Sequence, residues 1–182
     1  RQWYSLRQVP VLLASLCYVE QGSKLVSIAQ KSESITQNQL LLLPARHEFE
    51  IVNRPDQGAY RASMLSFSAD YLIGFKQRYQ GLLATEAAAS LRLALPVTAT
   101  LLRHWREVHS ALTEHASLAR QVHAADGLLL CLQEAQALDY WLSSPLQDWP
   151  EKLEQLFMLQ AWRDWTLESV AQHFHIGAST LR

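Results

Sequence analysis

The spacing of the apolar residues changes near Ser68, and this change constrains the fold more than any other feature of the chain. Before Ser68, apolar and polar residues alternate in short runs, as between Tyr60 and Phe67. After it, apolar residues recur every three or four positions. An alternating pattern is typical of strands and the longer period is typical of helices. The sequence therefore predicts an α+β fold in which strands come first and helices follow.

The first third of the chain predicts several short strands at a spacing of roughly 8–12 residues. Gly22 can take a positive φ, so the polar corner at 20–24 is expected to join two strands like a hairpin. Pro44 ends one apolar run, and the turn signal at 54–58 separates the last two strands. Such spacing predicts a small sandwich or barrel. The predicted strands span residues 9–20, 25–28, 40–43, 48–52 and 60–67.

The remainder of the chain predicts helices with apolar stripes. Residues 86–94 are Ala-rich and predict a loop or a short helix, and Pro96 is expected to open the helix that follows. The stripes are Leu72, Phe75 and Tyr79; then Val97, Leu101, Trp105, Val108 and Leu112; then Leu118, Val122, Ala125, Leu129 and Leu132; and finally, after Asp148, Leu153, Leu156 and Phe157. The third helix region also carries Leu128, Leu130 and Leu138 on other faces, which indicates either intradomain core or a dimer interface.

Residues 165–182 predict the opening of a helix-turn-helix. Thr166 can cap a helix whose apolar face carries Leu167, Val170, Ala171 and Phe174. A corner follows at 175–177, and a second helix begins at Ala178. This arrangement fits a motif whose second helix enters the major groove of DNA, and it also fits an ordinary pair of helices joined at a corner.

Three stretches, taken in order, resemble the AraC/XylS family of bacterial transcription regulators. Residues 18–24 (YVEQGSK) resemble a strand-turn-strand of the family's cupin-like sensor barrel, with a glycine-centred turn followed by lysine. Residues 40–47 (LLLLPARH) are similar to a later barrel strand, and residues 165–182 to the start of the first helix-turn-helix. The corner departs from the family at His175 and Gly177, where glycine and serine are usual.

The resemblance implies a cupin-like small β-barrel or sandwich, followed by a helical dimerisation region and the start of a helix-turn-helix. We expect a sensor domain at 1–84, the dimerisation region at 85–146, and a linker helix with the truncated DNA-binding motif at 147–182. Ser179, Thr180 and Arg182 are the positions implied to contact promoter DNA. Arg182 can form two hydrogen bonds with guanine, whereas Ser179 and Thr180 can equally cap the second helix.

The charge balance bears on where the chain could meet DNA. The whole chain has a net charge of −1, and residues 147–182 hold five acidic and three basic side chains. DNA-binding surfaces are usually basic, so this segment alone is not expected to bind DNA well. The chain begins at Arg1 and ends within a predicted helix, so we expect a fragment of a longer protein. Without a signal peptide or a membrane span, and with Cys17 and Cys131 as thiols, a cytoplasmic regulator is expected.

Three charged residues near the ends of predicted barrel strands are candidates for binding an effector. Lys24, Arg46 and His47 could meet an anionic small molecule, or they could be solvated turn residues, and some family members answer to a protein partner instead. His47 and Glu48 also raise the alternative of a metal-dependent cupin enzyme. A metal site needs three or more ligands, and the other six histidines lie in the helical part. We therefore expect no catalytic residue, metal or cofactor; a stand-alone sensor without DNA binding is a further alternative.

Overall fold

The computed structural model describes residues 4–29, 31–81, 90–143, 153 and 156–174. The chain divides into two compact units, Arg1–Leu146 and Gln147–Arg182.

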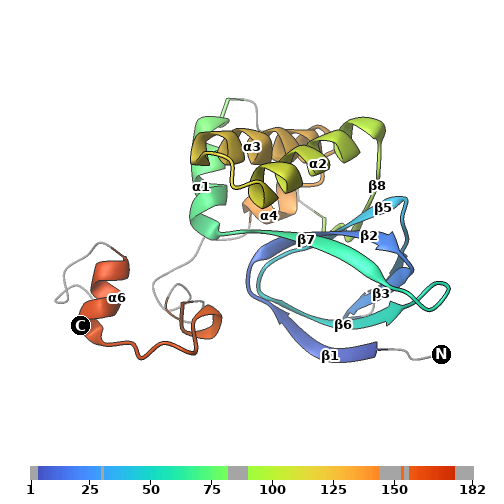
Figure 1. The fold of residues 1–182 in the computed structure, drawn as a ribbon, viewed down its shortest axis with the longest axis horizontal. Coiled ribbons are helices and arrows are strands. Elements are labelled where there is room, and N and C mark those ends of the chain that lie inside the picture. Colours follow the sequence, from blue (N-terminus) through green and yellow to red (C-terminus); the bar gives the residue numbers. More distant parts are fainter. Residues whose placement is uncertain (1–3, 30, 82–89, 144–152, 154–155, 175–182) are drawn as a thin grey trace. The chain divides into compact units, whose positions relative to one another are not determined.

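The first unit contains two four-stranded antiparallel sheets, shown in Figure 1. The first sheet has the strand order β1-β6-β3-β4 and the second has the order β7-β2-β5-β8. The two sheets do not join into a closed barrel, so the fold is a cupin-like sandwich followed by helices, which confirms the predicted α+β class. The strands are β1 Tyr4–Val11, β2 Ala14–Gln21, β3 Ser23–Ile28, β4 Lys31–Ile35, β5 Gln39–Leu43, β6 His47–Arg54, β7 Arg61–Phe67 and β8 Ala94–Pro96.

Several sequence predictions for the strands were wrong. The single strand predicted at 9–20 is two strands, which belong to different sheets. The corner at Gly22 is not a hairpin, because it carries the chain from β2 in the second sheet to β3 in the first. Gly22 does have a positive φ of 86°, and a Cβ there would lie 2.5 Å from the carbonyl oxygen of Arg54. Neither the polar edge strand β4 nor the three-residue β8 was predicted, because neither has an alternating apolar pattern.

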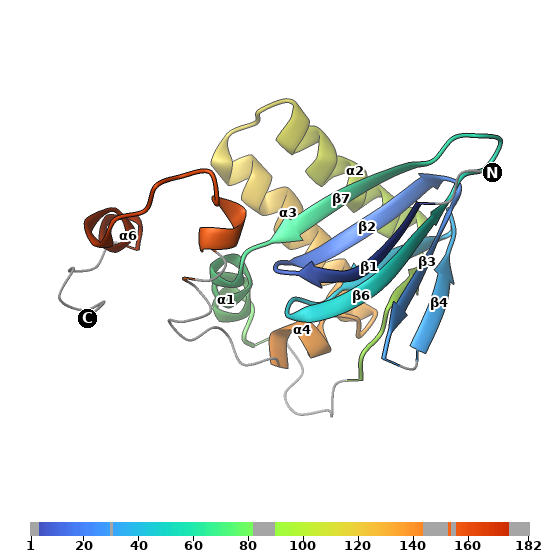
Figure 2. The ribbon, with the colours of Figure 1, turned by 90° about the horizontal axis from the view of Figure 1, so that it is seen from below.

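The second sheet is the middle layer of the unit, with the first sheet on one face and the helices on the other (Figures 1 and 2). Leu40 and Leu42 of β5 pack in the core shared with the helices, whereas Leu41 and Leu43 pack in the core between the sheets. Because both faces of this strand are covered, its side chains do not alternate between apolar and polar. The unbroken leucine run at 40–43 therefore reflects a strand at the centre of three layers.

Four helices of the first unit are described: α1 Ala69–Arg78, α2 Ala99–Thr113, α3 Leu118–Glu134 and α4 Asp139–Ser143. The predicted helix start at Pro96 was wrong, because Pro96 lies in β8 and Thr98 caps α2. The predicted stripe of α2 ends differently, since Ala111 is buried and Leu112 is 43% exposed. Leu118, predicted to lie on the apolar face of α3, is 75% exposed.

The additional leucines of α3 pack inside the first unit. Leu128 is fully buried in the core that α1 to α4 share with the second sheet, and Leu138 beyond the helix is buried in the same core. Leu130 is partly buried against it. Of the two alternatives raised by the sequence, intradomain core therefore accounts for these three side chains.

A buried carboxylate joins α1 to α3. Asp126 is 5% exposed, and its two oxygens accept hydrogen bonds from the Tyr71 and Tyr79 hydroxyls and from the Arg78 guanidinium. The Arg78 Nη2 and Tyr71 hydroxyl contacts are both 2.7 Å long. This carboxylate is the hydrogen-bonding centre of the contact between the two helices.

The second unit contains the short helix α6 Leu167–His173. Thr166 caps it as predicted, and Ser169 completes a capping box by accepting a hydrogen bond from the Thr166 backbone N–H. Val170 and Ala171 are buried, which confirms the predicted apolar face. A helical segment at 156–159 has Leu156 buried and Phe157 exposed. The predicted corner and second helix, including Ser179, Thr180 and Arg182, lie outside the described residues.

Candidate functional site

Lys24 lies in the space between the two sheets. It precedes the fully buried Val26 by two residues on β3, and it is the direct cross-strand partner of Asn53 on β6. Its ammonium donates one hydrogen bond of 2.8 Å to Asn53 Oδ1 and lies 5.5 Å from the centre of the Tyr60 ring. Burial lowers the pKa of Lys24, and the nearby Cys17 thiol raises it by a smaller amount. A partly desolvated cation therefore faces the inside of the sandwich.

The Tyr60 hydroxyl is the second polar group in this place. It is buried, and no described residue forms a hydrogen bond with it. Burial is also the main cause that raises the pKa of this phenol. A buried hydroxyl without a hydrogen-bond partner destabilises a fold by about 1–3 kcal/mol. A ligand group that accepts a hydrogen bond from this hydroxyl would therefore be bound favourably. Lys24 and Tyr60 together provide hydrogen-bond donors for an acidic ligand.

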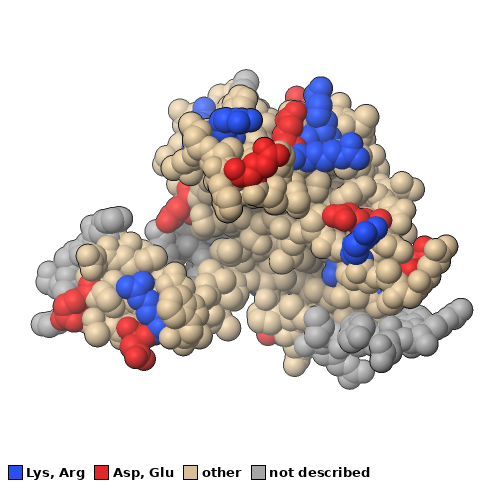
Figure 3. All heavy atoms as spheres, viewed as in Figure 1, with Lys and Arg blue, Asp and Glu red and all other residues tan. Residues whose placement is uncertain are grey.

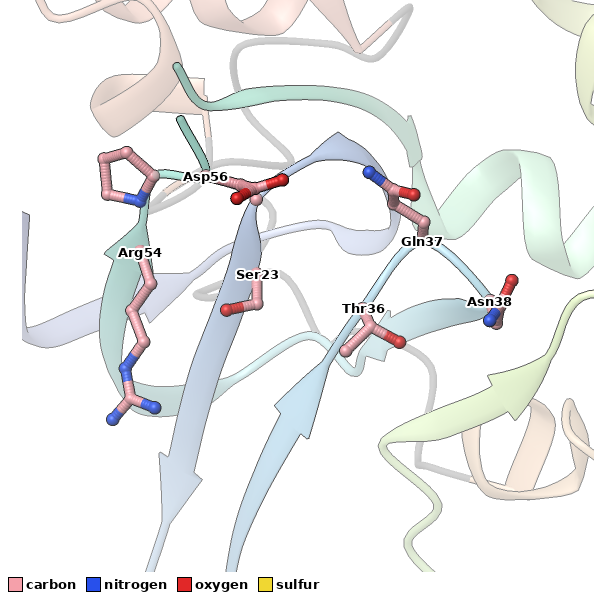
Figure 4. Close-up of a pocket in the computed structure, with 8 residues that line it drawn as sticks. Ser23, Thr36, Gln37, Asn38, Arg54 and Asp56 are labelled. Atoms are coloured by element: carbon pink, nitrogen blue, oxygen red, sulfur yellow. The ribbon is translucent and has the colours of Figure 1, made fainter. Parts of the chain in front are cut away.

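A polar pocket of about 410 Å³ lies at the same end of the sandwich (Figure 4). Figure 4 shows its side chains arriving from three separate segments, which are the start of β3, the β4–β5 turn and the end of β6. These segments meet because the chain crosses between the two sheets three times at this end. The pocket offers hydroxyl, amide, carboxylate and guanidinium groups. It is lined by Gly22, Ser23, Thr36, Gln37, Asn38, Arg54, Pro55 and Asp56.

Arg46 and His47 do not join Lys24 in one site. His47 begins β6, and Lys24 pairs with Asn53 six residues further along that strand, which corresponds to roughly 20 Å. His47 Nδ1 donates to the carbonyl of Ala45 at 2.8 Å, and its Nε2 lies 3.0 Å from the Tyr140 hydroxyl. Arg46 is exposed, in the turn before His47. His47 therefore connects the opposite end of the sandwich to α4.

The described residues show no arrangement suited to a metal. No group of three or more histidine, cysteine or carboxylate side chains comes together among them, and the Nδ1 of His47 faces a carbonyl. Cys17 and Cys131 are free thiols, and burial raises the pKa of both.

No helix within the described part of the chain is long and apolar enough to cross a bilayer.

Sequence reasoning singled out Lys24 as a candidate but did not single out Asn53, Tyr60 or Asp126. Asn53 and Tyr60 are brought to Lys24 by the pairing of β3 with β6 and by the turn after β6, which no local pattern reveals. Asp126 had a signal, since it is an acidic residue within an otherwise apolar stretch of a helix. A charge in such a position predicts a buried partner.

A family model described as an AraC-like ligand binding domain matches residues 10–132. Among solved structures, an apo ToxT variant from Vibrio cholerae superposes with a TM-score of 0.59 at 13% identity, over 97% of this chain and 67% of that one. ToxT bound to (E)-4-(8-methylnaphthalen-1-yl)but-3-enoic acid superposes with a TM-score of 0.57 at 13% identity, over 97% of this chain and 68% of that one. ToxT bound to an unsaturated fatty acid superposes with a TM-score of 0.50 at 14% identity, over 97% of this chain and 65% of that one. At these identities the likeness concerns the fold. A comparison with curated protein sequences gives no significant match.

Proposed function

The chain belongs to the AraC family of transcription regulators, and from this we propose that Lys24 and Tyr60 bind its effector. The observation that carries the proposal is a half-buried ammonium with one hydrogen-bond partner beside a buried hydroxyl with none, among the residues that the structure describes. An anionic group placed between them would accept from both, and charge-assisted hydrogen bonds are the stronger kind. The proposed effector is therefore an acid.

The class of acid follows from the surroundings of Lys24. Apolar side chains of the core between the sheets, such as Val19, Val26 and Ile51, continue inward from it. A carboxylic acid with an apolar body would place its charge at Lys24 and its body against these groups. ToxT, which shares the fold, has been crystallised with an unsaturated fatty acid and with a naphthalenyl butenoic acid, both of this class. Arg46 and His47, at the opposite end, are not part of the proposed site.

We assign the second unit to DNA binding by the regulator. The support is the Thr166 capping box and the buried face of α6, which suit the first helix of a helix-turn-helix. Ser179, Thr180 and Arg182 remain the proposed contacts to promoter DNA. The net charge is −1, and the face drawn in Figure 3 mixes basic and acidic side chains without a broad basic field. Affinity for DNA should therefore depend on parts of the regulator besides these residues.

The proposed regulator is a cytoplasmic homodimer with the layout predicted above: sensor domain at 1–84, helical dimerisation region at 85–146 and DNA-binding segment from 147. Effector binding would change how the linked DNA-binding units are presented, since a ligand shifts the equilibrium toward the state it binds more tightly. A protein partner acting on the sensor in place of a small effector is the second candidate.

Calorimetric titration with a ten-carbon unsaturated fatty acid tests the effector site. We expect the acid to bind and the alcohol of the same chain to bind at least tenfold more weakly. Lys24→Met should abolish the difference between acid and alcohol, because the cation that distinguishes them is gone. Lys31→Met is the matched control, since Lys31 is an exposed lysine on the edge strand β4. Equal binding of the acid by wild type and Lys24→Met would refute the proposed site.

Binding of promoter DNA by the full-length regulator tests the second assignment. We expect the affinity to fall steeply with salt, and Arg182→Ala to weaken binding at sites with guanine at the contacted position. If the full-length protein binds promoter DNA no more tightly than unrelated DNA, the stand-alone sensor becomes the better description.

A further inference from the structure

A second hollow lies between α2 and the strands β2 and β7, on the face of the second sheet that the helices cover. Its volume is about 490 Å³, which falls within the range of small-molecule sites. Lys24 is not among the lining residues, and Tyr18 and Glu20 point to the opposite face of the sheet from Cys17, which neighbours Lys24. This hollow is therefore separate from the proposed effector site.

The base of this hollow is aromatic. Trp105 of α2 is 4% exposed, and its ring centre lies 6.0 Å from that of the half-buried Tyr18 on β2. Leu102, one turn earlier on α2, is also half-buried and adds an apolar wall. Such a base favours a ligand with an aromatic or large apolar group.

The rim of the hollow carries two carboxylates that accept hydrogen bonds from the protein and one arginine that donates none to any described residue. Glu20 accepts a hydrogen bond of 2.9 Å from Ser63, and Glu114 accepts one of 2.5 Å from Ser110. Each carboxylate is thus oriented by a hydroxyl through one oxygen and keeps its other oxygen for a donor. Arg106, one turn before Ser110 on α2, forms no hydrogen bond or ion pair with any described residue. The rim therefore offers oriented acceptors for a cation and a guanidinium for an anion.

From this combination we infer that the hollow binds a zwitterionic α-amino acid with an aromatic or large apolar side chain. The side chain would lie against Tyr18, Leu102 and Trp105. The carboxylate would pair with Arg106, whose planar guanidinium can donate two parallel hydrogen bonds. The ammonium would be held by Glu20 or Glu114.

Three probes of one shape test this inference with the protein as it exists. Calorimetric titration with L-phenylalanine, phenylacetate and 2-phenylethylamine compares the zwitterion with compounds that lack either the ammonium or the carboxylate. We expect L-phenylalanine to bind at least tenfold more tightly than either, because only it satisfies both signs of charge. Equal binding of phenylacetate, or no binding of L-phenylalanine at millimolar concentration, would overturn the inference.

Substitutions at the rim identify where L-phenylalanine binds. Arg106→Gln and the double substitution Glu20→Gln/Glu114→Gln should each weaken L-phenylalanine binding roughly tenfold or more. Arg103→Gln is the matched control, because Arg103 is an exposed arginine of α2 that does not line the hollow. Circular dichroism checks that these variants, all at exposed positions, remain folded. If Arg103→Gln weakens binding as much as Arg106→Gln, the site is elsewhere.

Discussion

Two charged side chains lie inside the first unit, and they differ in how completely the fold surrounds them with partners. Asp126 of α3 accepts four hydrogen bonds, from Tyr71 and Arg78 of α1 and from Tyr79, the C-cap residue of that helix. Lys24, between the sheets, donates one hydrogen bond of 2.8 Å to Asn53 and lies beside the Tyr60 hydroxyl, which forms no hydrogen bond with any described residue. A buried charge is tolerated only when it is paired and hydrogen-bonded, so the two environments have different consequences.

The difference separates a structural charge from a candidate functional one. The oxygens of Asp126 are already occupied by donors of the protein, so no acceptor capacity is left that would favour a ligand. Lys24 can donate up to three hydrogen bonds, and the residues that the structure describes provide an acceptor for one of them. The first charge should therefore matter for stability and not for ligand binding, and the second should do the opposite.

Removing the carboxylate of Asp126 should have the largest effect. Asp126→Ala leaves two tyrosine hydroxyls and the partly exposed Arg78 without their common acceptor, and it should lower the free energy of unfolding by about 3 kcal/mol. Urea unfolding followed by circular dichroism measures the change. Glu134→Ala, at an exposed position of the same helix, is the control and should stay within about 0.5 kcal/mol of wild type. A similar small loss for both variants would show that the Asp126 cluster contributes little.

Substitution of Gly22, in the backbone close to Lys24, should destabilise the protein more than substitution of Lys24 itself. Gly22→Ala places a methyl group 2.5 Å from the Arg54 carbonyl at a φ of 86°, and should lower the free energy of unfolding by about 2 kcal/mol. Gly58→Ala has a similar φ of 80° but no atom within 4 Å of the new methyl group, so about 1 kcal/mol is expected. Thermal and urea unfolding of both variants compares the two. Equal losses would mean that the close contact with Arg54 relaxes without cost.

Some parts of this fold have a signal in the local sequence, and others do not. Alternation at 60–67, the leucine run at 40–43 and the Thr166 cap are local signals, and each corresponds to an observed element. The sequence predicts a hairpin at Gly22, where the chain in fact crosses between the sheets, because a glycine corner between two strands has the same local pattern in both cases. Which strand lies beside which is decided by packing across the whole sandwich.

The same limit applies to the candidate site. Lys24, Arg46 and His47 were grouped because each lies near the end of a predicted strand, but strand ends occur at both ends of a sandwich. The antiparallel register of β3 and β6 places Lys24 far from His47 and directly opposite Asn53. Tyr60 follows the turn at 54–58, and the sequence of that turn predicts a loop but not its neighbours. The proximity of Asn53 and Tyr60 to Lys24 is a property of the tertiary structure and not of any short motif.

Replacing Lys24 by an apolar residue of similar length should change stability little and in the favourable direction. Lys24→Met removes a partly desolvated charge and leaves Asn53 as the one polar group that loses a partner. We expect the free energy of unfolding to rise by up to about 1 kcal/mol, while binding of the acidic effector is lost. Urea unfolding and calorimetric titration of the same preparation measure the two properties. A loss of stability comparable to that of Asp126→Ala would contradict the distinction between the two charges.

The smallest expected effect concerns the pH dependence of stability. Folding lowers the pKa of Lys24 below its ordinary value of 10.5, which the unfolded chain retains. At pH values between the lowered pKa of the folded state and 10.5, the unfolded state therefore binds more protons than the native state. The free energy of unfolding contributed by Lys24 therefore rises with pH across this window. Cys17 and Tyr60, whose pKa values are raised, contribute with the opposite sign above about pH 9 and 10 respectively.

The difference between wild type and Lys24→Met separates the lysine from these two groups. We expect the stability advantage of Lys24→Met to shrink as the pH rises toward 10.5, as measured by urea unfolding at a series of pH values. Binding of the acidic effector by wild type should weaken over the same range, because an uncharged amine no longer attracts the carboxylate. A difference between the two proteins that does not change with pH would place Lys24 in ordinary solvent. The contrast with Asp126 would then rest on the number of hydrogen bonds alone.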